Sequence, residues 1–190
     1  CSLRLRNLAE PGSLMTETVI NKAKTVRLVV FDVDGVLTNG SLILGDKGDE
    51  YKVFHVHDGL GLVMLREAGL EIAVISARSS PIVAERMATL GIDYVYQGQS
   101  DKQTAITELM QKTGVNREET AYVGDDLIDL PAMNQAGLAI AVANAQPLVL
   151  QRADWVTEKA GGQGAVREVC EMILKAQGLL ETAYQRYLPG

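Results

Sequence analysis

Two carboxylates, Asp32 and Asp34, directly follow an apolar run and could serve as nucleophile, proton carrier or metal ligand. The run at 26–31 suits a strand buried on both faces of a parallel sheet, so Asp32 would stand where that strand ends. Ligands of open α/β sheets bind outside the carboxyl ends of the strands, and Gly35 lets the chain turn away there. Two acids at that edge repel each other, so we expect a cation between them, and Mg²⁺ takes oxygen ligands. Taken alone, the pair is also compatible with a solvated turn or part of a calcium loop.

Two further residues are predicted to lie at the same edge of the sheet. Ser76 follows an apolar run at 70–75, and its hydroxyl could hold a phosphate oxygen or simply cap the next helix. Lys102 would open a helix, where a cation opposes the helix dipole. It could therefore neutralise a phosphate and the carboxylates, although an ordinary surface lysine is the alternative.

A second acidic group, Asp125 with Asp126 and Asp129, follows a predicted strand at 120–123. Three acids in five residues at a strand end are costly without a cation. We expect Asp125 to ligate Mg²⁺ directly and Asp126 to act through water or orient a substrate. Asp129 would support these residues or cap a helix.

The rest of the chain predicts one α/β domain with a doubly wound, right-handed parallel sheet. Predicted strands lie at about 26–32, 70–75, 92–96, 120–123, 138–142 and 154–156. Helices are expected between them, the last one at 165–177 after a glycine-rich loop at 161–164 that could be a phosphate cradle but more simply marks the helix start. The predicted organisation is a flexible arm at 1–15, the domain at 16–177 and a tail at 178–190.

Two apolar segments around a Gly/Asp-rich turn predict a β-hairpin at 41–56. An isolated hairpin is only marginally stable in water, so we expect it to pack on a neighbouring subunit. Asp58 would cap a helix at 59–68. His55 and His57 would share one strand face and suggest a zinc pair, but no third ligand is apparent.

The composition indicates a globular cytoplasmic protein. Of 190 residues, 47% are hydrophobic and 22% charged, and the formal charge of −6 disfavours nucleic acid or an anionic membrane surface as partner. Two cysteines without a spacing pattern fit a reducing compartment. No secretory signal and no membrane-spanning run is found by sequence.

The sequence DVDGVLT at 32–38, Ser76, Lys102 and GDDLID at 124–129 together resemble the four motifs of the haloacid-dehalogenase (HAD) superfamily, in family order. The resemblance implies an HAD-like fold in which Asp32 is the nucleophile and Asp34 the general acid/base. It implies Ser76 and Lys102 as the second and third catalytic motifs. The metal ligands implied are Asp32, Asp34 and Asp125.

Segments 35–75 and 103–124 are too short to hold the cap domain that many HAD enzymes carry. The wider pattern, including FHVHDGLG at 54–61, LGI at 90–92 and AGGQGAVREV at 160–169, resembles the capless 3-deoxy-D-manno-octulosonate 8-phosphate phosphatase family. That resemblance implies a Mg²⁺-dependent homotetramer that hydrolyses a sugar-acid phosphate for lipopolysaccharide synthesis. It implies substrate contacts from Asp34, His55, Val56, His57, Asp58, Gly59, Arg78, Arg86, Lys102 and Asp126.

Guanidinium groups such as those of Arg78 and Arg86 suit a substrate that carries a carboxylate, although Arg86 could instead be a salt-bridged helix residue. His57 stands where the family pattern has Arg, and Ser76-Ala77 where it has Thr-Gly. Three alternatives stay open: a phosphatase for a related nonulosonate 9-phosphate, a phospho-accepting receiver module, and a catalytically silent binding module.

Overall fold

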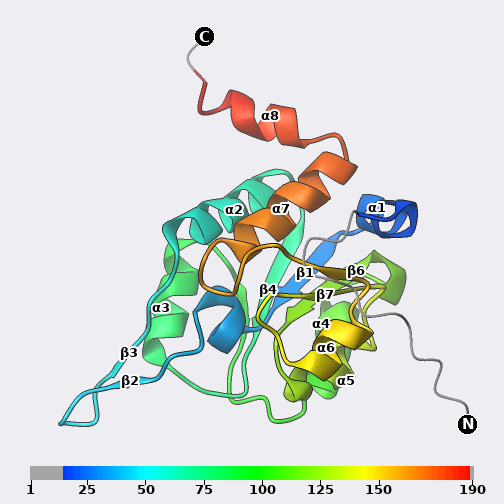
Figure 1. Cartoon of the computed structure of the whole chain (residues 1–190). Helices are drawn as coiled ribbons and strands as arrows, with labels where there is room; N and C mark the ends of the chain where they lie inside the picture. The colour runs from blue at the N-terminus through cyan, green and yellow to red at the C-terminus, as the bar shows by residue number, and fades with distance from the viewer. Residues whose placement is uncertain (1–14, 189–190) are drawn as a thin grey trace, which may run out of the picture.

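The computed structural model describes residues 15–188, and its centre is a six-stranded, fully parallel sheet in the order β5-β4-β1-β6-β7-β8 (Figure 1). All six predicted strands are present, so the expected α/β fold class is confirmed. The strands are β1 (Leu28–Phe31), β4 (Glu71–Ile75), β5 (Tyr94–Tyr96), β6 (Thr120–Gly124), β7 (Leu138–Ala141) and β8 (Trp155–Val156).

β1 lies in the middle of the sheet because every one of its residues is apolar and buried. Its last residue, Phe31, is in register with Val74 of β4 and Val123 of β6. These three strands therefore end level with one another. The residues that follow them come together at one edge of the sheet.

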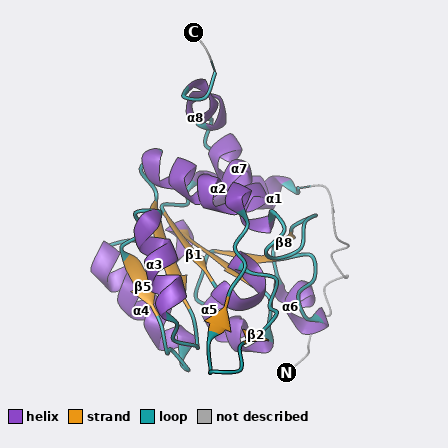
Figure 2. Cartoon of the chain, turned by 90° about the vertical axis from the view of Figure 1, so that its left-hand side faces the viewer, coloured by secondary structure: helices purple, strands orange, loops and turns teal. Residues whose placement is uncertain are grey.

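Two layers of helices cover the sheet (Figures 1 and 2). α2 packs on α7 and α7 on α1 in one layer, and α4 packs on α5 in the other. The helices are α1 (Glu17–Lys24), α2 (Val56–Glu67), α3 (Pro81–Thr89), α4 (Lys102–Thr113), α5 (Leu130–Met133), α6 (Pro147–Arg152), α7 (Ala165–Ala176) and α8 (Leu180–Gln185). None of those within residues 15–188 is long and apolar enough to cross a membrane.

The hairpin is much shorter than the predicted span of 41–56. β2 (Ile43–Leu44) and β3 (Glu50–Tyr51) pair over two residues each, and the hairpin projects from the body of the molecule (Figure 1). Its apolar side chains are exposed: Leu42, Ile43, Leu44, Tyr51 and Val53.

The start of α2 also differs from the prediction. The helix begins at Val56 with His55 as its N-cap, so His55 and His57 do not share a strand face. Asp58 does not cap α2. Its buried carboxylate accepts hydrogen bonds from the N–H groups of Gly164 (3.3 Å) and Arg167 (2.8 Å), at the start of α7. The unsatisfied N–H groups of a neighbouring helix thus attract the acid more strongly than its own helix does.

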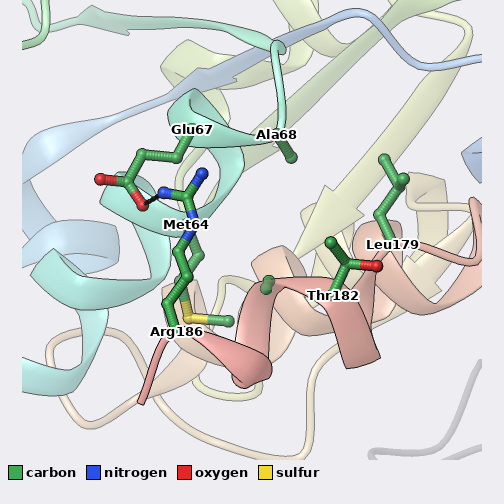
Figure 3. A pocket seen from close by; sticks show the side chains of 7 residues that line it. Met64, Glu67, Ala68, Leu179, Thr182 and Arg186 are labelled. Carbon is green, nitrogen blue, oxygen red and sulfur yellow. Dashed lines mark hydrogen bonds and ion pairs between the residues drawn. The ribbon is translucent and has the colours of Figure 1, made fainter. Parts of the chain in front are cut away.

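The segment at 178–188, predicted as a tail, contains a helix that the sequence analysis did not identify. It forms α8, in which the Tyr184 hydroxyl donates a 2.7 Å hydrogen bond to Glu171 of α7. Arg186 pairs with Glu67 of α2 beside a small pocket between α2 and α8 (Figure 3). The predicted arm at 1–15 lies, apart from its last residue, outside the described residues.

Candidate active site

A tight turn after β1 carries the first motif. Asp32 precedes a π-helical turn, Val33–Leu37, whose regular geometry is broken at Asp34 (φ −82°, ψ 102°) and Gly35 (φ 104°). The Thr38 hydroxyl donates to the Val33 carbonyl at 3.3 Å and accepts from the Gly35 N–H at 3.4 Å. This turn separates the side chains of Asp32 and Asp34.

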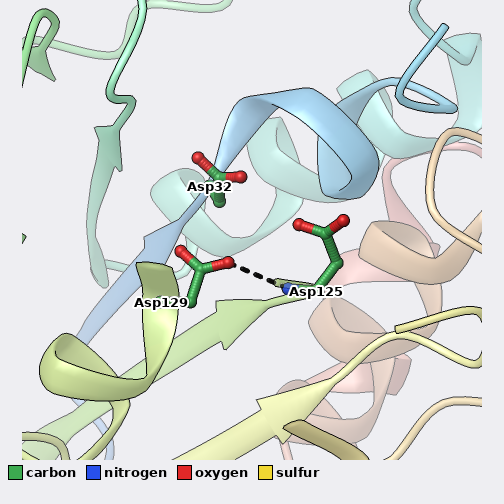
Figure 4. A group of neighbouring side chains, drawn as sticks. All are labelled: Asp32, Asp125 and Asp129. Carbon is green, nitrogen blue, oxygen red and sulfur yellow. Dashed lines mark hydrogen bonds between the residues drawn. The ribbon is translucent and has the colours of Figure 1, made fainter. Parts of the chain in front are cut away.

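Asp32, Asp125 and Asp129 form an acidic cluster at the sheet edge, each offering a carboxylate oxygen within 4.8 Å of the others (Figure 4). Gly35 permits this approach, because a Cβ at that position would lie 2.1 Å from Oδ2 of Asp125. The predicted convergence of the first and fourth motifs is confirmed.

Lys102 is a buried cation inside this cluster. Its Nζ donates to Oδ1 of Asp32 at 2.6 Å and to Oδ1 of Asp129 at 2.7 Å, and the residue is 2% exposed. It is the first residue of α4, whose N-terminal N–H groups are capped by Asp101. The prediction that Lys102 opens a helix and neutralises carboxylates is confirmed.

Asp129 is fully engaged by donors. Besides Lys102, its Oδ1 accepts from the Tyr122 hydroxyl at 2.8 Å, and its Oδ2 accepts from the backbone N–H groups of Asp125 (3.0 Å) and Asp126 (3.1 Å). It therefore fixes the loop that carries Asp125, as predicted for a supporting residue. Tyr122 was not identified from the sequence; the one signal was its hydroxyl in a strand that is apolar apart from Thr120.

The electrostatics of the cluster fit a divalent cation. Burial, reinforced by the charge of Asp129, raises the pKa of Asp32 to about 7 against the opposing effect of Lys102. Burial and the charges of Asp129 and Asp32 raise the pKa of Asp125 to about 7 as well. Oδ1 of Asp125 is buried without a hydrogen-bond partner in the described structure. A buried carboxylate oxygen without a partner, beside two further carboxylates, is a suitable Mg²⁺ ligand.

The carboxylate of Asp34 lies outside this cluster, and the expectation that Asp34 is a metal ligand stays a prediction. Its carboxylate, 23% exposed, pairs instead with the ammonium group of Lys52, which follows β3. Lys52 also lies 3.3 Å from Glu50, and Glu50 accepts a 3.1 Å hydrogen bond from Arg78. Lys52 was missed from the sequence, because a lysine in a hairpin is ordinarily exposed.

The remaining predicted residues surround this edge in different ways. Ser76 is buried at the end of β4, and its Oγ accepts a 3.1 Å hydrogen bond from the Arg78 N–H. Arg78 is half exposed, and Val56 is 72% exposed. Asp126 is exposed and caps the turn at Leu127–Asp129.

Arg86 of α3 lies between the hairpin root and α2. Its guanidinium is 6.0 Å from the centre of the Phe54 ring, and a Cβ on Gly59 would lie 2.4 Å from its Nη2. No carboxylate among residues 15–188 forms an ion pair with it, so the salt-bridged alternative is not observed there. The rings of His55 and His57 meet edge to face at 4.9 Å, and Nδ1 of His55 is buried without a partner in the described chain.

The glycine-rich loop before α7 supports the first motif. The Gly162 N–H donates to the Val36 carbonyl at 2.9 Å, and a Cβ on Gly161 would lie 1.6 Å from the Gly35 carbonyl oxygen. The loop therefore packs directly on the turn that follows Asp32. It marks the start of α7, as the simpler prediction stated.

The chain is similar to hydrolases of known function and structure. Residues 86–169 match a family described as haloacid dehalogenase-like hydrolase. The 3-deoxy-D-manno-octulosonate 8-phosphate phosphatase of Escherichia coli (strain K12) is 50% identical over 165 residues, which are 87% of this chain and 88% of that protein.

Two crystal structures of phosphatases with the same name resemble this chain in fold and sequence. The phosphatase of the same name from Yersinia pestis has a TM-score of 0.86 at 47% identity, covering 87% of this chain and 89% of the other. That of Moraxella catarrhalis, in complex with a magnesium ion, a phosphate ion and a KDO molecule, has a TM-score of 0.88 at 44% identity, covering 90% of this chain and 98% of the other.

Proposed function

Since the chain belongs to the 3-deoxy-D-manno-octulosonate 8-phosphate phosphatase family, we propose that it hydrolyses this sugar phosphate to 3-deoxy-D-manno-octulosonate and phosphate in lipopolysaccharide synthesis. The observation that carries the proposal is the cluster of Asp32, Asp125 and Asp129 around the Lys102 ammonium group. A cluster of this kind attracts a divalent ion and, with it, a phosphate.

The first chemical problem is repulsion between an anionic carboxylate and an anionic phosphate. Asp32 and Asp125 would hold Mg²⁺, which supplies charge neutralisation on the phosphate oxygens when bound. Lys102 adds a fixed positive charge 2.6 Å from the attacking carboxylate. Tyr122 and the backbone N–H groups keep Asp129, and through it Lys102 and the Asp125 loop, in place.

The reaction then takes two steps. An oxygen of Asp32 attacks phosphorus, the bond from phosphorus to the sugar oxygen breaks, and Asp34 gives its proton to the leaving alkoxide. In the second step Asp34 takes a proton from water, the water oxygen attacks the aspartyl-phosphate, and inorganic phosphate leaves. Asp32 and Asp34 both return to their starting states.

Substrate recognition would come from the rim formed by α2, α3 and the hairpin root. We propose that Arg78 and Arg86 bind the sugar-acid carboxylate, since guanidinium groups suit that anion. The unpartnered Nδ1 of His55 supports a substrate contact at the start of α2, together with Val56 and His57. Asp58 and Gly59 would act by positioning, because Asp58 is already bound to α7 and Gly59 lies against Arg86.

We further propose a cytoplasmic homotetramer. The support is the projecting hairpin, whose exposed apolar side chains need a partner surface in water. A neighbouring subunit seated near the site would also supply the cover that a capless enzyme lacks. The proposed reaction does not depend on the tetramer, because all of its catalytic residues belong to one chain.

A panel of sugar phosphates tests the function. The purified chain is assayed with Mg²⁺ on 3-deoxy-D-manno-octulosonate 8-phosphate and on a nonulosonate 9-phosphate, and again with a chelator. Fastest Mg²⁺-dependent turnover of the octulosonate ester is expected. Preference for the nonulosonate ester would favour the related phosphatase. Stable phosphorylation without turnover would favour the receiver, an alternative that the similarity to hydrolases already disfavours.

A further inference from the structure

Lys52 carries a buried positive charge and lies outside the acidic cluster. The chemistry proposed above gives it no role. Its side chain is 2% exposed, although the residue lies in the connection between an exposed hairpin and α2. Removing an ammonium group from water costs several kcal/mol unless carboxylates compensate the charge. Two do so here, Asp34 and Glu50.

The two carboxylates differ in their dependence on Lys52. Glu50 has a second cationic partner, since Arg78 donates to it at 3.1 Å. Asp34 has none: within residues 15–188, Lys52 supplies the hydrogen bond that its carboxylate accepts, and no other side chain does. The direction of the Asp34 side chain is thus set by one residue from the hairpin root.

We propose that Lys52 is a positioning residue for the proton-transfer step, which it controls by holding the Asp34 carboxylate away from the metal cluster and toward the leaving group. Asp34 follows Asp32 by two residues, and the acidic cluster would otherwise attract a shared cation to both. With Lys52 in place, Asp32 faces the cluster while Asp34 faces the hairpin root. One turn of chain thereby supplies a nucleophile and a separate proton carrier.

The inference rests on the proposed phosphatase function and has a test that distinguishes the two. An alkoxide leaving group needs a proton from Asp34, whereas the p-nitrophenolate ion leaves without one. Values of kcat/KM are therefore measured on 3-deoxy-D-manno-octulosonate 8-phosphate and on p-nitrophenyl phosphate. A misplaced proton donor should cost about a hundredfold on the sugar ester. It should cost far less on the aryl ester, because kcat/KM reports the steps up to transfer of the phosphoryl group.

The variants are Lys52→Met, Lys52→Arg and the double variant Lys52→Met/Asp34→Asn. Lys52→Met should show the selective loss, and Lys52→Arg, which keeps the charge, should recover part of the sugar-ester rate. Because Lys52 acts through Asp34, the double variant should be no slower than Asp34→Asn alone. Lys22→Met is the matched control, since Lys22 also pairs with an aspartate, Asp154 at 2.7 Å, but lies on α1. It should leave both rates unchanged.

Failure of the Lys52 proposal and failure of the phosphatase function would give different results. Equal losses on both esters, or an additive double variant, would overturn the positioning role and indicate that Lys52 serves folding or phosphate binding. If Lys52→Met does not fold, Lys52→Arg decides: a loss confined to the sugar ester supports the proposal, and an equal loss on both esters contradicts it. A wild-type chain that hydrolyses neither ester would refute the proposed function instead.

Discussion

Replacing Gly35 with alanine tests the packing of the first motif against the fourth. A Cβ at this position would lie 2.1 Å from Oδ2 and 2.5 Å from Cγ of Asp125, so the carboxylate would have to retreat by roughly 1 Å, a misplacement that costs about a hundredfold in rate. The positive φ of 104° adds a backbone cost of about 1–2 kcal/mol for any residue with a side chain. Gly35→Ala should therefore lose activity and stability together.

For wild type and Gly35→Ala, kcat/KM is measured at saturating and at limiting Mg²⁺. Thermal unfolding of the same proteins measures the loss of stability. We expect kcat/KM to fall about a hundredfold and the Mg²⁺ dependence to move to higher concentration, because Asp125 is a proposed metal ligand. Gly69→Ala is the control. Gly69 also has a positive φ, 92°, but a Cβ there meets nothing within 4 Å, so this variant should lose stability alone.

Two results would refute this reasoning. Wild-type activity in Gly35→Ala would show that Asp125 need not lie against the turn. An equal loss of activity in Gly69→Ala would show that backbone strain, and not the contact with Asp125, limits the enzyme.

Three further outcomes are expected. Without metal, the free energy of unfolding should fall as pH rises from about 4 to about 7, because the raised pKa values of Asp32 and Asp125 mean that the folded state holds these protons more tightly. Mg²⁺ should therefore stabilise the protein more at pH 8 than at pH 5. Thermal unfolding at both pH values, with and without Mg²⁺, checks this. Tyr122→Phe should cost about 1–2 kcal/mol by removing one donor to Asp129, measured by denaturant unfolding, and a null effect would show that the remaining donors suffice. Serine at both Leu42 and Leu44 should convert the oligomer to monomers by native mass spectrometry, and an unchanged mass would exclude the hairpin as the interface.

The sheet and its reactive edge could be predicted because they depend on local patterns. The apolar run at 26–31 favours a buried strand, and the acids that follow such runs mark the edge where the strands stop. Lys102 was identifiable because a cation at a helix start is locally unfavourable. The structure confirms each of these placements.

The differences arise where tertiary contacts override local signals. The apolar segment after the Gly/Asp-rich turn favoured a strand as far as residue 56, but the chain turns into α2 there, and Asp58 binds α7 instead of its own helix. Lys52 is buried because its ammonium group pairs with Asp34 and Glu50. The pairing with Asp34, 18 residues away, could not be predicted from the sequence around Lys52. The segment at 178–188 forms α8, whose Tyr184 and Arg186 contact Glu171 of α7 and Glu67 of α2 from far along the chain.

The proposed mechanism depends on Asp32 as the nucleophile that forms a bond to phosphorus. A single turnover of the octulosonate ester with Mg²⁺, stopped in acid and treated with borohydride, would mark the phosphorylated carboxylate for peptide mass mapping. We predict the mark on Asp32, and its disappearance in Asp32→Asn together with turnover. A mark on Asp34 or Asp125, or turnover that persists in Asp32→Asn, would contradict the mechanism.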